Sequence, residues 1–409
     1  MTKRPAAARL EAWTVVVESQ WDELSLLTAA GPFTRPGWIR CVVNAFFPGV
    51  AVKLLVVRRG DAIAGVLPLL TVGRSHVSPT TWHTPRFGPV LADPPAGQAM
   101  AEAICSLRGR QVVLRFIDAE NQTLRQLHTA DARGLTIQRV LMRSPYVDVS
   151  GDWEDYLKRF STSWRRNVRR RWRRLSEFGD VSFDITYGGD RLGEHLEAGL
   201  RVEAASWKGE AGTAIISDPR TRRFYTDIAY WAAAVGTLRL AHLRVDGGTA
   251  AFVYGLEQDN TFYALKTAYD PAFQAAGPGG LQMLKLIEHA FTSPRLSRFE
   301  LLGADEPWKR ELSDAAHVLV ESRTFTGRHC ARADLFAARV ARVVTDAARE
   351  RVPPEAWARA AGARDVAGLA LFRHRHGAQA RPSASALADP SELPKPTAAA
   401  EPSALADRQ

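Results

Sequence analysis

Residues 274–280 have the sequence QAAGPGG and separate two different hydrophobic patterns. Before them, residues 237–245, 249–257 and 261–268 are rich in apolar and β-branched side chains and are separated by turn formers, which predicts a three-strand meander. After them, apolar residues recur at helical spacing over residues 280–291. Glycines at a helix start leave backbone N–H groups free to approach an anion, so this order favours a cradle for a phosphate or pyrophosphate group. Taken alone, such a loop is better explained as an ordinary loop with glycines at a helix start, and the order of the surrounding elements is what favours the cradle.

Strand and helix patterns also alternate towards the N-terminus. Strands are expected at residues 13–18, 53–59 and 62–70, with a helix at residues 38–47. A turn at residues 59–61 joins two of these strands into a hairpin. When Gly60 is aligned with Gly247, the apolar positions of this hairpin match those of the meander. The match favours a duplicated unit, although any two hairpins share some of this pattern.

The complete pattern predicts an α/β (α+β) chain with two tandem units, each a mixed central sheet flanked by helices. The first unit is expected to span residues 1–150 and the second residues 151–330, the second opening with an aromatic and basic helix over residues 152–178. Residues 331–376 are rich in Ala and Arg and predict a helical extension. Residues 377–409 are rich in Ala, Pro and Ser and predict a disordered tail.

Composition narrows the class of protein. The chain has 409 residues, a formal net charge of +10 and 46% hydrophobic residues, which is enough to build real cores and excludes global disorder. Its three cysteines are scattered and favour neither a disulfide framework nor a zinc site, so a reduced, cytoplasmic protein without a metal is expected. No apolar run approaches the roughly 18 residues that a membrane span needs, and the N-terminus lacks the apolar run of a signal peptide.

The positive charge is concentrated in one segment. Residues 158–174 contain nine basic residues and no acidic one. Aromatic and apolar residues recur in the same segment every three or four positions, which predicts an amphipathic helix with one buried stripe. Like charges at neighbouring helical positions repel by about 0.2–0.5 kcal/mol per pair, so an anion is expected to offset the cost. Transfer RNA, a lipid headgroup, a polyphosphate and the phosphates of a coenzyme all fit, and Arg169 and Arg170 are the candidate contacts.

Several segments together resemble a known family. The order of meander, glycine-rich loop, helix and further strand is similar to that with which GNAT acetyltransferases bind acyl-coenzyme A, and their pattern Gln/Arg-x-x-Gly-x-Gly/Ala is matched by Gln274, Gly277 and Gly279. The segments SWRRNVRRRWRRLSEFG (residues 163–179), EAASWKG (203–209), LRVDGGTAAFVYGL (243–256), ALKTAYDPAF (264–273) and FELLGADEPWK (299–309) resemble the CelD/BcsL-type acetyltransferase domain of cellulose biosynthesis. This family is related to the Fem-type peptidyl transferases, and the likeness covers about residues 10–330.

The resemblance implies two GNAT-like units, of which only the second has the glycine-rich loop. It also implies that acetyl-coenzyme A is the acyl donor. The first unit is then expected to bind no coenzyme and to shape the acceptor cleft. The candidate coenzyme-binding residues are Val253, Tyr254, Gln274, Gly277, Gly279 and Gly280.

Acyl transfer to an amine needs a group that accepts the proton of the amine, and it needs no covalent nucleophile. Glu203, beside the SWKG motif, is the first candidate base, with a solvated helix carboxylate as the alternative. Tyr269 and Asp270 lie between the last meander strand and the loop and are candidate catalytic residues, although Tyr-Asp-Pro is also a good turn. Lys208, Asp305 and Lys309 are candidate acceptor contacts; Asp305 and Lys309 follow the last strand, and an ordinary surface lysine is the favoured alternative for Lys208.

The sequence favours an N-acyltransferase that transfers an acetyl or other acyl group from coenzyme A to an amine. An aminoacyl-tRNA-dependent Fem-like transferase is one alternative. A non-catalytic binding module in envelope polysaccharide biosynthesis is another. The acceptor remains open among amino sugars, polyamines, amino acids and protein amines.

Overall fold

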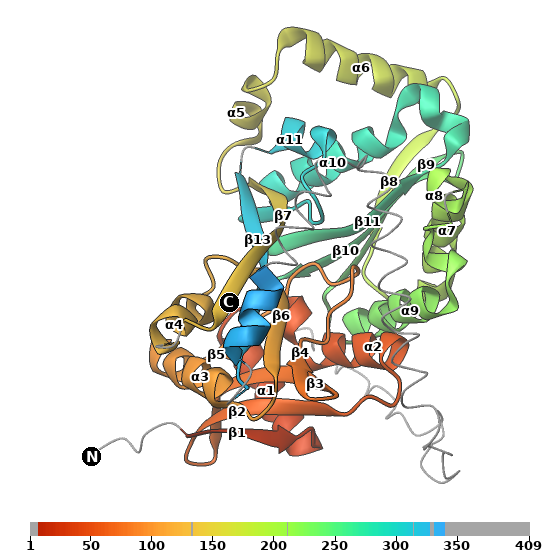
Figure 1. Cartoon of the computed structure of the whole chain (residues 1–409). Helices are drawn as coiled ribbons and strands as arrows, with labels where there is room; N and C mark the ends of the chain where they lie inside the picture. Colours follow the sequence, from red (N-terminus) through yellow and green to blue (C-terminus); the bar gives the residue numbers. More distant parts are fainter. Residues whose placement is uncertain (1–6, 132–133, 211, 314, 328–330, 340–409) are drawn as a thin grey trace, which may run out of the picture. The chain divides into compact units, whose positions relative to one another are not determined.

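A computed structural model describes residues 7–131, 134–210, 212–313, 315–327 and 331–339 of the chain. The residues up to Ala337 form one compact unit (Figure 1). Residues 331–339 are helical, and the rest of the expected extension and tail lies outside the described residues.

The described residues contain thirteen strands, which form one mixed sheet. The strands are β1 (Ala7–Ala12), β2 (Val52–Arg59), β3 (Ala62–Val72), β4 (Ser75–Val77), β5 (Val90–Leu91), β6 (Gln111–Asp118), β7 (Thr136–Asp148), β8 (Val181–Thr186), β9 (Leu238–Val245), β10 (Gly248–Gln258), β11 (Thr261–Tyr269), β12 (Arg298–Glu300) and β13 (Ala315–Phe325). Their order across the sheet is β1-β2-β3-β4-β6-β13-β7-β12-β11-β10-β9-β8, and β5 pairs with β3.

Helices cover both faces of this sheet. The α-helices are α1 (Val15–Leu27), α2 (Pro36–Phe46), α3 (Pro94–Ser106), α4 (Gln122–Ala130), α5 (Trp153–Lys158), α6 (Thr162–Ser176), α7 (Leu192–Ala205), α8 (Trp207–Glu210), α9 (Pro219–Ala234), α10 (Pro278–Thr292) and α11 (Pro307–Leu312). Short 3₁₀ helices are η1 (Pro32–Thr34), η2 (Ile215–Ser217) and η3 (Pro271–Ala276). The predicted class, a mixed sheet flanked by helices, is confirmed.

The two expected units share the sheet. β7 pairs with β13 along most of its length and with β12 at its end, through Tyr146, Val147 and Asp148. β13 comes from the end of the second expected unit, but it lies between β6 and β7 of the first. A cut at residue 150 would therefore separate β13 from both of its neighbours.

The strand expected at residues 13–18 is wrong. β1 ends at Ala12, and α1 begins three residues later. Thr14 caps the helix, because its hydroxyl accepts a hydrogen bond from the backbone N–H of Val17. Val17, Trp21 and Leu24 are buried at helical spacing. The run of valines resembles a strand, but the positions that reach the core follow the helical period.

The single basic helix expected at residues 152–178 is also wrong, because the chain forms two helices there. Ser161 lies between α5 and α6, and its hydroxyl accepts a hydrogen bond from the backbone N–H of Trp164. The ring of Phe160 stacks on that of Trp164 with a centroid separation of 4.0 Å. The aromatic stripe continues across the break, so its spacing did not reveal the new helix start.

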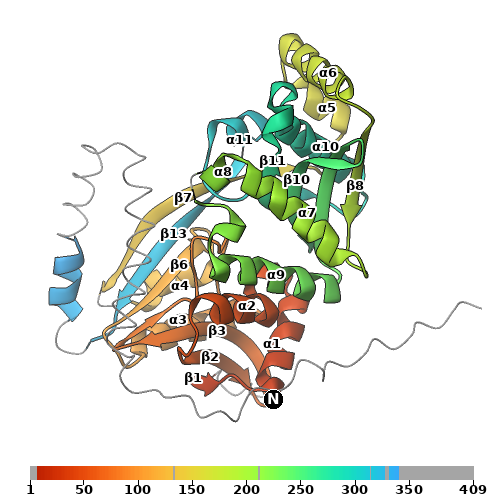
Figure 2. The ribbon, with the colours of Figure 1, turned by 90° about the vertical axis from the view of Figure 1, so that its right-hand side faces the viewer.

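The largest hydrophobic cluster joins the two halves. It includes Trp21 and Trp38 from the first half and Phe224 and Tyr254 from the second. Helix α2 packs against α9, as Figure 2 shows. Gly37 permits this close approach, since a Cβ at that position would lie 1.9 Å from Nε1 of Trp231. Helices α2, α7 and α9 therefore form one layer that both halves of the chain build. This layer is called the helical wall.

Candidate functional site

The glycine-rich segment lies between β11 and α10. After β11, residues 271–276 form η3, and Gly277 takes the left-handed conformation with φ 65°. Pro278 is the first residue of α10, and no side chain caps this helix. The backbone N–H groups of Gly279 and Gly280, in the first turn, have no intrahelical acceptor. The end of the helix thus offers free donors and the positive end of a dipole.

Within the cradle, space for a side chain is tight at Gly279. A Cβ on Gly279 would lie 3.1 Å from the ring of Tyr269. Tyr269 itself packs in the hydrophobic cluster beneath η3 and α10. The carboxylate of Asp270 accepts a hydrogen bond from the backbone N–H of Ala272 and so begins η3. Gln274 is exposed, and its carbonyl accepts a hydrogen bond from the N–H of Gly277.

The sheet opens beside this cradle. β11 and β12 pair in parallel only over Thr261–Tyr263 and Arg298–Glu300, so the later residues of β11 have no partner on that side. The pairing with β10 shifts register between Tyr254 and Gly255, which leaves Leu265 as the extra residue on β11. Backbone groups of β11 are consequently available to a ligand that enters between the two strands.

This free edge is one strand away from the residues that the sequence suggested. Val253 and Tyr254 lie on β10, which is paired with β9 on one side and β11 on the other. Both side chains are fully buried. The hydroxyl of Tyr254 donates to the backbone carbonyl of Tyr225 at 2.8 Å. Val253 and Tyr254 therefore support the sheet beneath the site. The strand with the unpaired backbone edge is β11.

Glu203 and Lys208 connect the helical wall to β11. Lys208 Nζ donates to Glu203 Oε1 at 3.2 Å and to the backbone carbonyl of Thr267 at 2.7 Å. The other oxygen of Glu203 accepts the backbone N–H of Ile215 at 2.9 Å. Glu203 is only 1% exposed. The structure thus brings two predicted site residues together, with both oxygens of the carboxylate already hydrogen-bonded.

A second lysine lies beside this pair. Lys266, on β11, has its Nζ 5.4 Å from the ring centroid of Tyr225. Burial, with a smaller contribution from the charge of Lys208, lowers the pKa of Lys266 to about 8. A lysine of this kind is partly neutral near neutral pH and can accept a proton. Sequence reasoning missed Lys266, although a lysine within an otherwise apolar strand is a signal that could have identified it.

The first half of the chain contributes His83 to the same wall. Its ring stacks on Phe46 at 5.4 Å, and its two nitrogens lie 3.4 and 3.5 Å from the hydroxyls of Tyr225 and Thr221. Burial, with a smaller contribution from the charge of Lys266, lowers the pKa of His83 to about 3. His83 is therefore neutral at ordinary pH. It too was absent from the residues that the sequence suggested.

The candidates after β12 differ in their environment. Lys309 is buried, and its Nζ donates to the backbone carbonyls of Leu302 at 2.7 Å and Ala304 at 3.2 Å. Burial lowers the pKa of Lys309. Asp305 forms an ion pair with Arg310 at 3.7 Å. Lys309 thus fixes the segment that follows β12, on the far side of the opening from Lys208.

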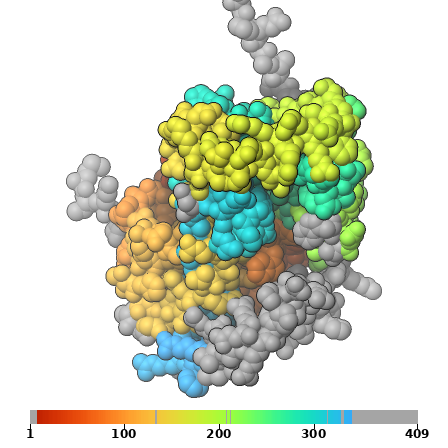
Figure 3. Space-filling model, turned by 90° about the horizontal axis from the view of Figure 1, so that it is seen from above, coloured from red at the N-terminus to blue at the C-terminus, as the bar shows by residue number. Residues whose placement is uncertain are grey.

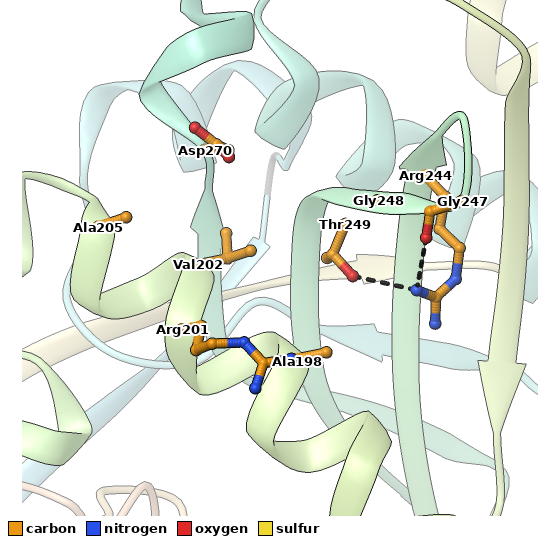
Figure 4. Close-up of a pocket in the computed structure, with 9 residues that line it drawn as sticks. All are labelled: Ala198, Arg201, Val202, Ala205, Arg244, Gly247, Gly248, Thr249 and Asp270. Carbon is orange, nitrogen blue, oxygen red and sulfur yellow. Dashed lines mark hydrogen bonds between the residues drawn. The ribbon is translucent and has the colours of Figure 1, made fainter.

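A polar pocket of about 410 Å³ lies between α7 and the β9–β10 hairpin. In Figure 4, Arg201 and Val202 form its helical side, and Asp270 lies at one end. The guanidinium of Arg244 donates to the hydroxyl of Thr249 at 3.1 Å and forms an ion pair with Asp184. Asp270 directly follows β11 and begins η3, so the pocket adjoins the segment that leads into the glycine-rich cradle.

The comparisons with known proteins agree with this geometry. Residues 162–310 match the model of the family described as acetyltransferase (GNAT) domain. These residues include α7, β9–β11, the glycine-rich cradle and α10, so this part of the chain has the GNAT fold. No curated protein matches the chain.

Solved structures extend the likeness beyond that domain. FemX has a TM-score of 0.52 and 11% identity, over 78% of this chain and 97% of FemX. A C-terminal domain described as that of a lysylphosphatidylglycerol synthetase from Agrobacterium fabrum has a TM-score of 0.50 and 11% identity, over 79% and 95% of the two chains. A conserved protein of unknown function from Bacteroides thetaiotaomicron has the same score and identity, over 77% and 99%. At this identity the similarities establish the fold alone.

Two further findings concern the described residues. They contain no group of three or more His, Cys, Asp or Glu side chains arranged to hold a metal ion. None of their helices is long and apolar enough to cross a membrane.

Proposed function

We propose that the chain is an N-acyltransferase, which transfers an acetyl or other acyl group from coenzyme A to an amine by direct attack. The observation that carries this proposal is the coincidence of the GNAT family match with a glycine-rich cradle and an open strand edge in the same segment. Under this proposal, two residues shape the donor site. Asp270 caps η3, and Tyr269 packs beneath Gly279.

The donor fits the two features of β11 and α10. The free N–H groups of Gly279 and Gly280 would hold the diphosphate of the coenzyme, and the ring of Tyr269, 3.1 Å from where a Cβ on Gly279 would lie, disfavours a side chain there. The unpaired edge of β11 offers hydrogen-bonding groups to the amide-containing arm of the coenzyme. Bound coenzyme supplies an activated thioester. We assign to the backbone N–H groups near the bulge at Leu265 the role of hydrogen-bond donors to the thioester carbonyl.

The acceptor amine approaches from the wall formed by α7, α9 and the segment at His83. Its nitrogen must lose a proton before or during attack. Lys266 is the proton acceptor that we favour, because its pKa of about 8 is close to the working range. Glu203 remains the competing candidate, but its carboxylate already binds Lys208 and the N–H of Ile215. We assign Glu203 and Lys208 the role of holding β11 against α7, with Lys309 supporting the other side of the opening.

Thiol release with a panel of amines and acetyl-coenzyme A, together with calorimetric binding of the coenzyme, tests this function. Gly280→Glu places a carboxylate in the cradle, where a Cβ has open space apart from Arg171 at 4.0 Å. Repulsion of the phosphates should weaken coenzyme binding by about tenfold or more. The matched control is Gly151→Glu, at an exposed glycine whose Cβ would meet nothing within 4 Å. If the folded wild-type protein binds no coenzyme and no amine releases thiol, the enzyme proposal is wrong.

The proposal also covers the cellular compartment, the family type and the role of each half of the chain. We infer a cytoplasmic enzyme of the CelD/BcsL type in polysaccharide biosynthesis, with residues 1–150 shaping the acceptor cleft and residues 151–330 binding the donor. Support for this comes from the motifs at residues 163–179 and 299–309 and from the position of His83 in the wall. A folded protein that binds neither coenzyme nor aminoacyl-tRNA would instead favour a binding module.

A further inference from the structure

The arginines of α6 have no carboxylate partners. Helix α6 contains seven arginines, and within the described part of the chain none of them forms an ion pair. They are Arg165, Arg166, Arg169, Arg170, Arg171, Arg173 and Arg174. Among the hydrogen bonds between described residues, Arg170 is the one of the seven whose side chain takes part, through a bond to Asn167. The surface that they form is seen from above in Figure 3, where residues 162–176 are coloured yellow to yellow-green.

The helix buries one side and presents two distinct flanks. Leu175 is fully buried and Val168 partly buried, against the cluster beneath η3 and α10. At about 100° per residue, Arg171 lies some 60° from Val168 and Arg174 lies farther round on the same flank. Arg166 and Arg173 lie about 140–160° from Val168, on the side that points away from the core. The seven charges are therefore not equivalent.

The flank with Arg171 lies over the glycine-rich cradle. A Cβ on Gly277 would be 3.4 Å from Nη1 of Arg171, and a Cβ on Gly280 would be 4.0 Å from the same atom. The C-terminal end of α6 is held beside η3, because the rings of Phe178 and Phe273 meet edge to face at 5.3 Å. An exposed guanidinium without a carboxylate partner is thus held at the mouth of a site that already presents free N–H donors.

We propose that Arg171, supported by Arg174 on the same flank, binds the phosphate groups of the acyl donor. This inference rests on the proposed function and adds a side-chain clamp to the backbone cradle. The donor coenzyme carries a diphosphate and a separate ribose phosphate, and planar guanidinium groups suit such oxygens. Bound phosphates also offset the repulsion between the arginines, which no carboxylate of the described residues relieves.

A surface that bound nucleic acid or an anionic membrane would use the outward arginines as well. The geometry favours the donor, because the guanidinium of Arg171 lies directly beside Gly277 and Gly280, the glycines of the cradle. Two double variants separate these possibilities. Arg171→Ala with Arg174→Ala removes two charges from the flank at the cradle. Arg166→Ala with Arg173→Ala removes two charges from the outward side.

Calorimetric titration of both double variants and the wild type with coenzyme A, at two salt concentrations, tests the proposal. The Arg171/Arg174 variant should bind about 10- to 100-fold more weakly, from the loss of one or two charge-assisted hydrogen bonds. Its salt dependence should also be shallower, while the Arg166/Arg173 variant stays within about twofold of the wild type. With S-acetylpantetheine, which lacks the diphosphate and the ribose phosphate, the rates of thiol release should be equal in all three proteins.

The results of these titrations distinguish a failure of the proposed function from a failure of the phosphate clamp. If the folded wild type does not bind coenzyme A, the proposed function fails, and this inference fails with it. If the wild type binds but both double variants match it, or if both weaken equally, the function stands and the phosphate clamp is overturned. Equal loss of binding to anionic vesicles or to an RNA oligonucleotide in both variants, with coenzyme affinity unchanged, would overturn it in favour of a macromolecular surface.

Discussion

Replacing His317 with alanine should destabilise the folded protein, because this side chain joins two carboxylates from different strands. Its Nδ1 lies 2.9 Å from Asp118 on β6, and its Nε2 lies 3.0 Å from Glu300 on β12. Nη2 of Arg86 lies 3.2 Å from the second carboxylate oxygen of Glu300. The side chain of Glu300 is only 1% exposed. Both ring nitrogens face acceptors, so both must carry a hydrogen. The ring is therefore an imidazolium held between the two carboxylates.

The pKa shifts of the network agree with this geometry. Burial opposes the charge on His317, but the hydrogen bonds to Asp118 and Glu300 outweigh it and raise its pKa above 6.5. Burial likewise opposes ionisation of Glu300, but the contacts with His317 and Arg86 lower its pKa below 4.5. The pKa of Asp118 also falls, below 3.8, where burial is outweighed by the bond to His317.

These directions fix how stability depends on pH. The contribution of His317 is complete below its unfolded pKa of about 6.5 and is lost as pH rises through the higher folded pKa. The contributions of the two carboxylates are present above about 4.5 and are lost as pH falls through their lowered folded values. The network is thus fully formed between about pH 4.5 and 6.5. The difference between wild type and His317→Ala should be largest there and should shrink at pH 9.

The magnitude follows from two charge-assisted hydrogen bonds. Each contributes about 1.5–3 kcal/mol, and partial exposure of Asp118 reduces the sum, so we expect a loss of about 3–5 kcal/mol at pH 5.5. For a compact unit of 337 residues, an unfolding entropy of about 2.1 cal/mol/K per residue gives about 0.7 kcal/mol/K. The melting temperature should then fall by about 4–7 °C.

Chemical denaturation at pH 5.5 and pH 9 measures the change, with His128→Ala as the control. His128 is exposed in the last turn of α4, so its replacement should cost less than about 1 kcal/mol. A loss below about 1 kcal/mol for His317→Ala at pH 5.5, or a loss that is the same at both pH values, would refute the imidazolium assignment.

Three other substitutions test the core and the site. Gly199→Ala places a Cβ 2.4 Å from the ring of Phe252 and should destabilise the protein by about 1–3 kcal/mol in chemical denaturation. Tyr254→Phe removes the hydroxyl that donates to the carbonyl of Tyr225; because this carbonyl lies within α9 and also accepts a helical hydrogen bond, the change should cost only about 0.5–1.5 kcal/mol in the same assay. Under the proposed function, kcat/KM of the wild type should rise with pH with an apparent pKa of about 8, and Lys266→Met should remove this rise because the proposed proton acceptor is then absent.

Two of these substitutions have a matched comparison variant. Gly193→Ala, on the same helix, places its Cβ 3.5 Å from the hydroxyl of Tyr230 and should be tolerated. For the proton acceptor, Glu203→Gln is the comparison. If Glu203→Gln abolishes the rise in rate and Lys266→Met leaves it in place, Glu203 is the base and the assignment of Lys266 is wrong. If Tyr254→Phe is as stable as the wild type, its hydroxyl does not support the carbonyl of Tyr225.

The parts of the fold that sequence reasoning predicted are those whose contacts are local. The meander β9–β11, its turns and the start of α10 depend on neighbouring residues, and the structure has them close to the expected positions. β13 was not expected at all, because its pairing with β6 and β7 joins segments that lie more than a hundred residues apart. The valines at the start of α1 were misassigned because a short apolar run fits a strand and a helix equally.

The same distinction separates the two sides of the candidate site. The donor side is contiguous in the sequence, since β11, η3 and the first turn of α10 follow one another within twenty residues, from Thr261 to Gly280. Its glycines leave a pattern that can be recognised without a structure. The wall opposite is assembled from Glu203 on α7, Tyr225 on α9, Lys266 on β11 and His83 in a segment of the first half. No spacing along the chain connects these four residues, and only the fold does so.

Under the proposed function, the choice of acceptor amine should therefore depend on residues that belong to no recognisable sequence motif. His83 is neutral, and its ring lies between Phe46 and the hydroxyls of α9, so it offers a hydrogen-bonding edge without a charge. Lys266 adds a cation that is partly neutral near its pKa. Substitution at His83 would alter the shape and polarity of the wall and leave the glycine-rich cradle untouched, because the two lie on different elements and different halves of the chain. Specificity for the amine can in this way change while the donor chemistry stays the same, which explains why the sequence indicates an acyl donor but does not indicate the acceptor.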